Sequence, residues 1–108
     1  MTTRPRELRE YQTAEGRFPF SEWIEGLRDV RGRAILRKRL NRIRLGNLGD
    51  CRSVGHGIRE LRVDFGPGYR IYFGEDGDTV VILLCGGDKS SQPADIRRAQ
   101  TFWADYWS

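Results

Sequence analysis

The chain has 108 residues, 38% of them hydrophobic and 31% charged, which indicates a single globular domain over residues 1–108 and excludes a disordered chain. The formal net charge of +4 at pH 7 favours a polyanionic partner or an acidic protein. No apolar run reaches the length of a membrane span, and no apolar stretch follows the two arginines of residues 1–6, so we expect a cytoplasmic protein without a signal peptide.

The first third of the chain predicts a short strand and a helix. The strand is expected over residues 7–12. Pro19 fits the first turn of a helix, where its missing N–H costs no hydrogen bond. Trp23, Ile24 and Leu27 then fall on one face of that helix, which we expect to pack on the core.

A second helix is predicted after the stretch 29–32, which separates it from the first. Leu36, Leu40 and Ile43 recur at helical spacing within it. The helix is expected to end at three residues that tolerate a left-handed backbone: Gly46, Asn47 and Gly49.

The second half of the chain predicts an antiparallel meander. Apolar and polar residues alternate over 60–65 and over 69–73, with a turn at 66–68, which is typical of a hairpin with one buried face. That face carries Leu61, Val63, Phe65, Tyr69, Ile71 and Phe73. The run 79–85 is continuously apolar after its first residue and predicts a central strand covered on both faces.

The chain ends with a predicted loop and a predicted helix. Residues 86–91 form the loop, Ser91 is expected to cap the helix, and Pro93 lies in its first turn. Four residues at three- and four-residue steps are expected to bury one side of the helix: Ile96, Ala99, Trp103 and Trp107. The predicted order is therefore β-α-α-β-β-β-α, in the α+β class.

The first candidate site is the face of the hairpin opposite the core. Arg62, Arg70 and Tyr72 are expected to share this face in contact with solvent, because adjacent antiparallel strands bring such residues within about 5 Å of one another. The alternative is structural, with Arg62 paired to Asp64 or Glu60 on a solvated sheet surface.

The second candidate site is the loop 86–91 together with the start of the last helix. Lys89 and Gln92 are expected to reach a phosphate or a base there, because loops often carry function and a helix N-terminus favours anions. The alternative is an ordinary glycine-rich connection with a solvated lysine.

The third candidate site is the basic second helix. Residues 30–49 contain seven basic residues and no acidic one. Candidate contacts to RNA phosphates are Arg37, Lys38, Arg42 and Arg44. The alternatives are an acidic segment of a protein partner and a simple solvated helix face.

The sequence predicts neither a metal site nor a cofactor. His56 is the only histidine, and it is interpreted as a loop residue rather than a general base because no carboxylate is fixed beside it. Cys51 and Cys85 lack a metal-like or redox-like spacing and are interpreted as reduced thiols, with Cys85 in the core.

Five short strings occur in a fixed order along the chain. They are Phe20-Ser21-Glu22-Trp23, Gly46-Asn47-Leu48-Gly49-Asp50, Glu60-Leu61-Arg62, Gly66-Pro67-Gly68-Tyr69-Arg70-Ile71-Tyr72 and Gly86-Gly87-Asp88-Lys89-Ser90-Ser91-Gln92. As an ordered set, with Asp95-Ile96 after the last, they resemble the HigB-like addiction-module killer proteins of the RelE/ParE superfamily. The resemblance spans about residues 18–103.

This resemblance implies a RelE-like fold, with two N-terminal helices packed on a mainly antiparallel sheet. It implies a cognate antitoxin, commonly of helix-turn-helix type, as the partner. RelE-type members bind the ribosomal A site and cut mRNA, whereas ParE-type members inhibit DNA gyrase, so the fold alone does not decide the target. The leading hypothesis is a ribosome-dependent endoribonuclease that blocks translation. The alternatives are a non-catalytic gyrase inhibitor and a non-toxic RNA-binding protein or structural relic that keeps the fold without either activity.

The resemblance also implies roles for three cations. Arg70 matches an arginine that stabilises charge on the scissile phosphate. Arg62 matches a basic residue that helps to activate the 2′-hydroxyl of the substrate, and Lys89 is the nearest equivalent of a third basic residue. The implied reaction is an intramolecular transesterification, in which the 2′-oxygen attacks the adjacent phosphorus and the 5′-oxygen leaves.

One expected catalytic residue is missing from the sequence. RelE itself uses a tyrosine early in its last helix, where this chain has Asp95-Ile96. Tyr72 or Gln92 is therefore expected to take that role.

Overall fold

The computed structural model describes residues 4–108, so residues 1–3 of the predicted domain and of the basic N-terminal segment lie outside the described part. The elements follow in the order β1 (Glu7–Glu10), α1 (Pro19–Glu25), α2 (Val30–Arg44), β2 (Cys51–Ser53), β3 (Ile58–Val63), β4 (Tyr69–Asp76), β5 (Val80–Asp88), the single 3₁₀ turn η1 (Lys89–Ser91) and α3 (Gln92–Trp107). The strands form one sheet in the order β1-β5-β4-β3-β2, in which only the pairing of β1 with β5 is parallel.

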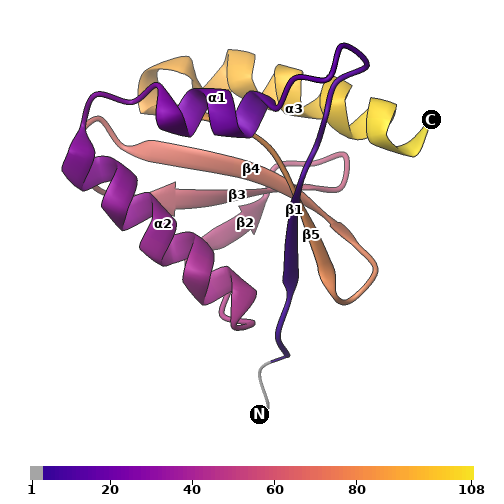
Figure 1. The fold of residues 1–108 in the computed structure, drawn as a ribbon, viewed down its shortest axis with the longest axis horizontal. Coiled ribbons are helices and arrows are strands. Elements are labelled where there is room, and N and C mark those ends of the chain that lie inside the picture. The colour runs from indigo at the N-terminus through magenta and orange to yellow at the C-terminus, as the bar shows by residue number, and fades with distance from the viewer. Residues whose placement is uncertain (1–3) are drawn as a thin grey trace.

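The α+β class and the two N-terminal helices on a mainly antiparallel sheet are confirmed (Figure 1). The sheet has one strand more than predicted, because β2 was missed. Its three residues are half-buried or exposed and show no apolar alternation, so only their pairing with the edge of β3 identifies them as a strand. The first strand is confirmed and ends at Glu10 rather than at residue 12.

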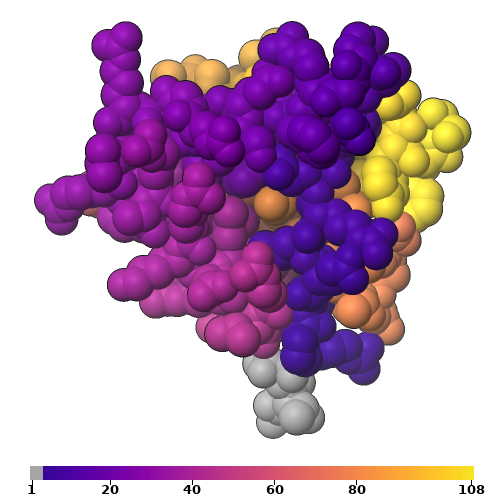
Figure 2. Space-filling view, viewed as in Figure 1, coloured from indigo at the N-terminus to yellow at the C-terminus, as the bar shows by residue number. Residues whose placement is uncertain are grey.

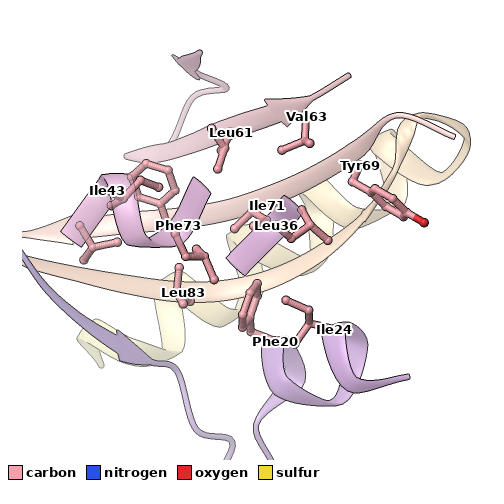
Figure 3. Close-up of a cluster of buried hydrophobic side chains, with 12 residues drawn as sticks. Phe20, Ile24, Leu36, Ile43, Leu61, Val63, Tyr69, Ile71, Phe73 and Leu83 are labelled. Carbon is pink, nitrogen blue, oxygen red and sulfur yellow. The ribbon is translucent and has the colours of Figure 1, made fainter. Parts of the chain in front are cut away.

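Helices cover both faces of the sheet, so the molecule has two hydrophobic cores. We call the face under α1 and α2 the α1/α2 face, and its core is shown in Figure 3. It joins Phe20, Leu36 and Leu40 of the two helices to Ile71 and Phe73 of β4. We call the opposite face the α3 face, where α3 packs on the sheet through a second buried cluster.

The predicted hairpin is confirmed, and its apolar residues lie on the α1/α2 face as expected. The expectation that its other face meets solvent was wrong. Arg70 is only 6% exposed, and Tyr72 is fully buried, because α3 covers the α3 face. The alternation revealed which side chains share a face, but it carried no information about what covers that face.

The prediction of a central fifth strand covered on both faces is confirmed, whereas the predicted loop after it was wrong. Residues 86–88 continue the strand, and only the turn Lys89–Ser91 separates it from α3. A register shift between β4 and β5 near Leu84 lets Leu84 and Cys85 both pack in the α3-face core. Beyond the shift, Gly86 faces the Trp23 indole and Gly87 faces α3.

The helix ends differ from the predictions in detail. The stretch 29–32 is not a separate connection, because Asp29 caps α2 by accepting a hydrogen bond of 2.9 Å from Gly32 N. Ser91 precedes α3 as predicted, but its hydroxyl makes no capping bond to the helix backbone. Trp107, expected on the buried side of α3, is 57% exposed. The predicted end of α2 is confirmed at Gly46, whose φ is +95°.

Candidate functional site

The register of the sheet places two predicted site residues side by side. Arg62 on β3 is the cross-strand partner of Arg70 on β4, and Arg70 is in turn opposite Gly87 on β5. Both arginines therefore lie on the α3 face. Like charges directly opposite one another destabilise a sheet, so an anion between them would relieve the repulsion.

The guanidinium groups of this pair have unsatisfied N–H donors. Arg70 donates from Nη1 to Tyr69 O at 3.2 Å, but its buried Nε has no hydrogen-bond partner. The buried Nε of Arg62 also lacks one, since it lies 3.7 Å from Asp50 Oδ2, beyond hydrogen-bond distance. Among residues 4–108, Arg70 forms no ion pair. Arg6 and Arg59 also have a buried Nε without a partner, so the feature particular to this pair is the direct opposition of two positive charges, which an anion would relieve.

Lys89 joins the same site from the turn after β5. A Cβ atom placed on Gly68 would lie 3.4 Å from Lys89 Cβ and 3.5 Å from Arg70 Nη1. Gly68 has a φ of +82°, so the tight turn both requires glycine and leaves this space open. We call Arg62, Arg70 and Lys89 the cationic cluster, in which the two arginines are cross-strand partners and the Cβ of Lys89 lies near Gly68 and Arg70.

A buried carboxylate lies in the adjacent cross-strand row of the same face. Glu60 pairs with Arg52 of β2 on one side and with Tyr72 of β4 on the other, and it is completely buried. Its Oε2 accepts hydrogen bonds from Tyr72 Oη at 3.0 Å and from Gln92 Nε2 at 2.7 Å. Its Oε1 accepts one from Arg52 Nε at 3.2 Å. Glu60 therefore ties β2, β4 and the start of α3 together.

This hydrogen-bond network gives Tyr72 and Gln92 surroundings that the sequence did not predict. Burial, followed by the charge of Glu60, raises the pKa of Tyr72 far above that of an ordinary tyrosine, and its hydroxyl has no access to solvent. Gln92 is only half-buried, and its amide links α3 to the sheet. The sequence interpretation missed Glu60, although its alternation with Arg62 indicated that the two share a face.

A second buried carboxylate, Asp95, was not identified from the sequence as an interacting group. It accepts a hydrogen bond from the Ser91 hydroxyl and one from Arg98 Nη1 at 3.1 Å. It also lies directly against Gly87, where any side chain would overlap its carboxylate. No signal in the sequence pointed to this contact, because it depends on how closely α3 approaches β5.

The basic residues of α2 lie on the other side of the sheet from the cationic cluster. Arg37, Lys38, Arg42 and Arg44 are all exposed, and none forms an ion pair within residues 4–108. Side chains of α2 project outward on the face that Figure 2 shows. The structure therefore does not unite this predicted RNA-binding group with the predicted catalytic group, because α2 packs on the α1/α2 face.

A groove of about 800 Å³ runs between α1, α2 and the edge strand β1. Its apolar lining includes Leu8, Phe18, Phe20, Ile24 and Leu40. Three of the basic α2 residues, Arg37, Lys38 and Arg44, also line it. The groove therefore combines these apolar residues with basic residues along α2, and the carboxylates of Glu10 and Glu25 also line it.

The remaining candidates are placed away from the cationic cluster or in the core. His56 is exposed in the β2–β3 connection, with a φ of +56°. Cys51 and Cys85 are both free thiols, and burial raises the pKa of Cys85 to about 12. Within the described residues there is no group of three or more side chains suited to hold a metal ion. No helix in this part of the chain is long and apolar enough to cross a membrane.

Comparison with known proteins identifies relatives over most of the chain. The family model described as "Phage derived protein Gp49-like (DUF891)" matches residues 20–102, which include the cationic cluster, Glu60 and Gln92. A Haemophilus influenzae protein, named only as uncharacterized, is 47% identical over 81 residues, which cover 75% of this chain and 82% of that protein. The chain therefore belongs to the Gp49-like family of phage-derived proteins.

Proposed function

We propose that this protein is the toxin of a type II toxin–antitoxin module and cuts mRNA on the translating ribosome. The observation that carries the proposal is the cationic cluster, in which two cross-strand arginines keep buried N–H groups without an acceptor beside a lysine. Arg62 already has the Asp50 carboxylate 3.7 Å from its Nε, whereas Arg70 has no acidic partner within residues 4–108, and a phosphodiester would supply one. Membership of the Gp49-like family and the resemblance of the ordered strings to HigB-like toxins support the same assignment.

The proposed reaction is transesterification within the mRNA backbone. The 2′-oxygen forms a bond to the adjacent phosphorus as its proton leaves, and the bond from phosphorus to the 5′-oxygen breaks. The leaving oxygen takes up a proton, so the products are a 2′,3′-cyclic phosphate and a 5′-hydroxyl. Arg62, Arg70 and Lys89 stabilise the negative charge that builds up on the phosphorane oxygens.

The cationic cluster is better suited to holding a phosphate than to moving protons. Arginine is a poor base, because it stays protonated in proteins. Tyr72 is removed from this role by its burial and its raised pKa. Catalysis would then depend on alignment of the 2′-oxygen with phosphorus, which accounts for a need for the ribosome as a positioning scaffold.

The antitoxin is the proposed protein partner, and the groove along α2 is the surface we assign to it. An amphipathic acidic segment of the antitoxin fits the apolar lining, and its carboxylates fit Arg37, Lys38 and Arg44. The groove and the cationic cluster lie on opposite faces of the sheet. An antitoxin segment bound in this groove would therefore leave the cationic cluster itself unfilled.

Two arginines on β3 provide a matched test of the proposed reaction. Arg62 and Arg59 have similar side-chain exposures of 38% and 36%, and each has a buried Nε without a hydrogen-bond partner. They point to opposite faces, because Arg59 pairs with Phe73, a residue of the α1/α2-face core. Arg62→Gln should slow mRNA cleavage by roughly 100-fold, the usual cost of losing one donor to a developing charge, whereas Arg59→Gln should not.

The measurement is a purified translation system with the wild type and both variants, in which cleaved 5′ ends are mapped on translated and untranslated mRNA. Cleavage confined to translated mRNA and lost in Arg62→Gln supports the proposal. Intact mRNA together with DNA breaks in growing cells would replace it with gyrase inhibition. Equal loss of cleavage in both variants would remove the assignment of the cationic cluster.

A further inference from the structure

We infer that Gln92 is a specificity-determining residue that recognises the ribose 2′-hydroxyl of a nucleotide bound at the cationic cluster, and that Glu60 is the positioning residue that orients it. The inference rests on the proposed function only in taking the cluster as the phosphate-binding site. It adds to the RNA substrate of the proposed function the side chain that distinguishes RNA from DNA, on the basis of one side-chain orientation.

The orientation of the Gln92 amide follows from the chemistry of its partner. Gln92 offers a donor, Nε2, and an acceptor, Oε1, and either can face a neighbour. Glu60 already accepts hydrogen bonds from Tyr72 and Arg52, and a carboxylate has only acceptors to offer. The nitrogen of Gln92 must therefore face Glu60, as the 2.7 Å contact places it. The amide cannot turn over without losing this hydrogen bond.

The other end of the amide is free to bind a ligand. Within residues 4–108, no donor reaches Gln92 Oε1, and this atom is not among the buried side-chain atoms that lack a partner. Since Gln92 as a whole is half-buried, its carbonyl oxygen retains access to solvent. The fixed amide therefore presents an acceptor, and a ligand at this point must supply a donor.

The acceptor lies at the edge of the cationic cluster. Arg70 and Tyr72 lie in one row on the α3 face of β4, about 7 Å apart, and the turn residue Gly68 immediately precedes this strand. Lys89 approaches this row at Gly68, and the contact between Gln92 and Glu60 lies at Tyr72. Arg70 is thus flanked by a lysine on one side and by the oriented glutamine on the other.

The ribose 2′-hydroxyl is the donor that this geometry fits. It is present at every nucleotide of RNA and lies next to the backbone phosphate, whereas DNA has no donor there. An amino group of a base is a second kind of donor, but its distance from the phosphate varies with the base and its conformation. We therefore assign Gln92 to the sugar, and 2′-modified probes distinguish the two sources.

The test is direct binding without ribosomes. Three fluorescein-labelled hexanucleotides of one sequence serve as probes: RNA, DNA and 2′-O-methyl RNA, which keeps the oxygen but loses the donor. Fluorescence anisotropy at low salt should show the wild type binding RNA roughly three- to tenfold more tightly than either other probe, the range expected for one hydrogen bond. Gln92→Met should bind all three equally, with its affinity for DNA unchanged.

Two further variants separate orientation from general damage to the fold. Glu60→Gln lets the Gln92 amide turn over, so it should reduce the preference for RNA while retaining affinity for DNA. A merely structural role for Glu60 would not change this ratio, because loss of folded protein weakens all three probes alike. Gln100→Met, in the same helix, should leave the preference unchanged.

The outcomes separate this inference from the function it rests on. Equal binding of RNA and DNA by the wild type would overturn the role of Gln92 while leaving the phosphate-binding cluster intact. A preference for RNA that survives in 2′-O-methyl RNA would overturn the assignment to the hydroxyl. Failure of every probe to bind, or binding that Arg62→Gln does not weaken, would overturn the cationic cluster as a phosphate site and this inference with it.

Discussion

Gly86 lies where β5 passes beneath the indole of Trp23, and adding a single methyl group there should destabilise the protein. A Cβ atom on Gly86 would overlap the six-membered part of the indole, which is rigid and is packed against Phe20 and Tyr69. The backbone itself tolerates alanine, because Gly86 is not among the glycines with positive φ. Gly86→Ala should therefore act through space alone.

The magnitude follows from the cost of overpacking. Inserting a methyl group into a packed core costs about 1–3 kcal/mol, and the rigid partner places Gly86→Ala in the upper half of this range. In a domain of this size, that loss lowers the melting temperature by about 4–8 °C per kcal/mol. Trp23→Phe removes Cε3 and Cζ3, the two indole atoms that the methyl group would approach most closely, but keeps a carbon at Cδ2, so the relief is partial. The cost of this substitution is about 1 kcal/mol in buried apolar area.

The decisive measurement is a double-mutant cycle by urea unfolding, followed by circular dichroism because the variants alter tryptophan fluorescence. The double variant should be more stable than the sum of the two single losses predicts, by about 1 kcal/mol or more. Additive losses, or a Gly86→Ala variant within about 0.5 kcal/mol of the wild type, would refute the reasoning. Either result would mean that the indole moves away easily.

Two further predictions concern hydrogen bonds to carboxylates. Tyr72→Phe should lower the free energy of unfolding by about 1.5–3 kcal/mol in urea titrations, because the buried Glu60 loses a hydrogen-bond donor. Oligonucleotide binding by the folded variant should be unchanged. A binding defect greater than that of Gln92→Met would contradict the burial of the Tyr72 hydroxyl. The pKa of Asp29 is lowered below its ordinary value of 3.8, mainly by the backbone N–H of Gly32 and then by the Tyr69 hydroxyl. The ionised Asp29 therefore stabilises the folded state fully above pH 3.8, and this stabilisation is lost as the pH falls through the lowered pKa. Asp29→Asn keeps a capping side chain that does not titrate, so the variant should lose stability less steeply than the wild type between about pH 4 and pH 2 in acid titrations. An unchanged slope would show that Asp29 contributes nothing to the pH dependence of stability.

Local patterns in the sequence were sufficient for the hairpin and for the meeting of two arginines. The alternation around the 66–68 turn determines which residues share a face, and a short turn leaves little freedom in register, so Arg62 and Arg70 were correctly expected together. The same reasoning failed for their surroundings. The periodicity of the last helix predicts that it buries a side, but not which face of the sheet receives it.

The features that sequence reasoning missed depend on contacts between distant segments. Glu60 looked like a solvated surface charge, because a carboxylate is rarely buried, and its burial is tolerable only with the hydrogen bonds from Arg52, Tyr72 and Gln92. Gly86 and Gly87 looked like a loop, since glycine usually weakens a strand. In the fold they are the strand residues over which Trp23 and Asp95 approach the backbone most closely.

The parallel pairing of β1 with β5 has a consequence for how the molecule is made. Glu7 of β1 pairs with Val80 of β5, so β1 can pair only after about seventy further residues have been synthesised. Pairings between such distant segments form late in folding. The β1 edge of the sheet, which lines the groove, is thus completed at the end of synthesis. A partner that binds this groove would therefore meet a complete binding surface only on the finished chain.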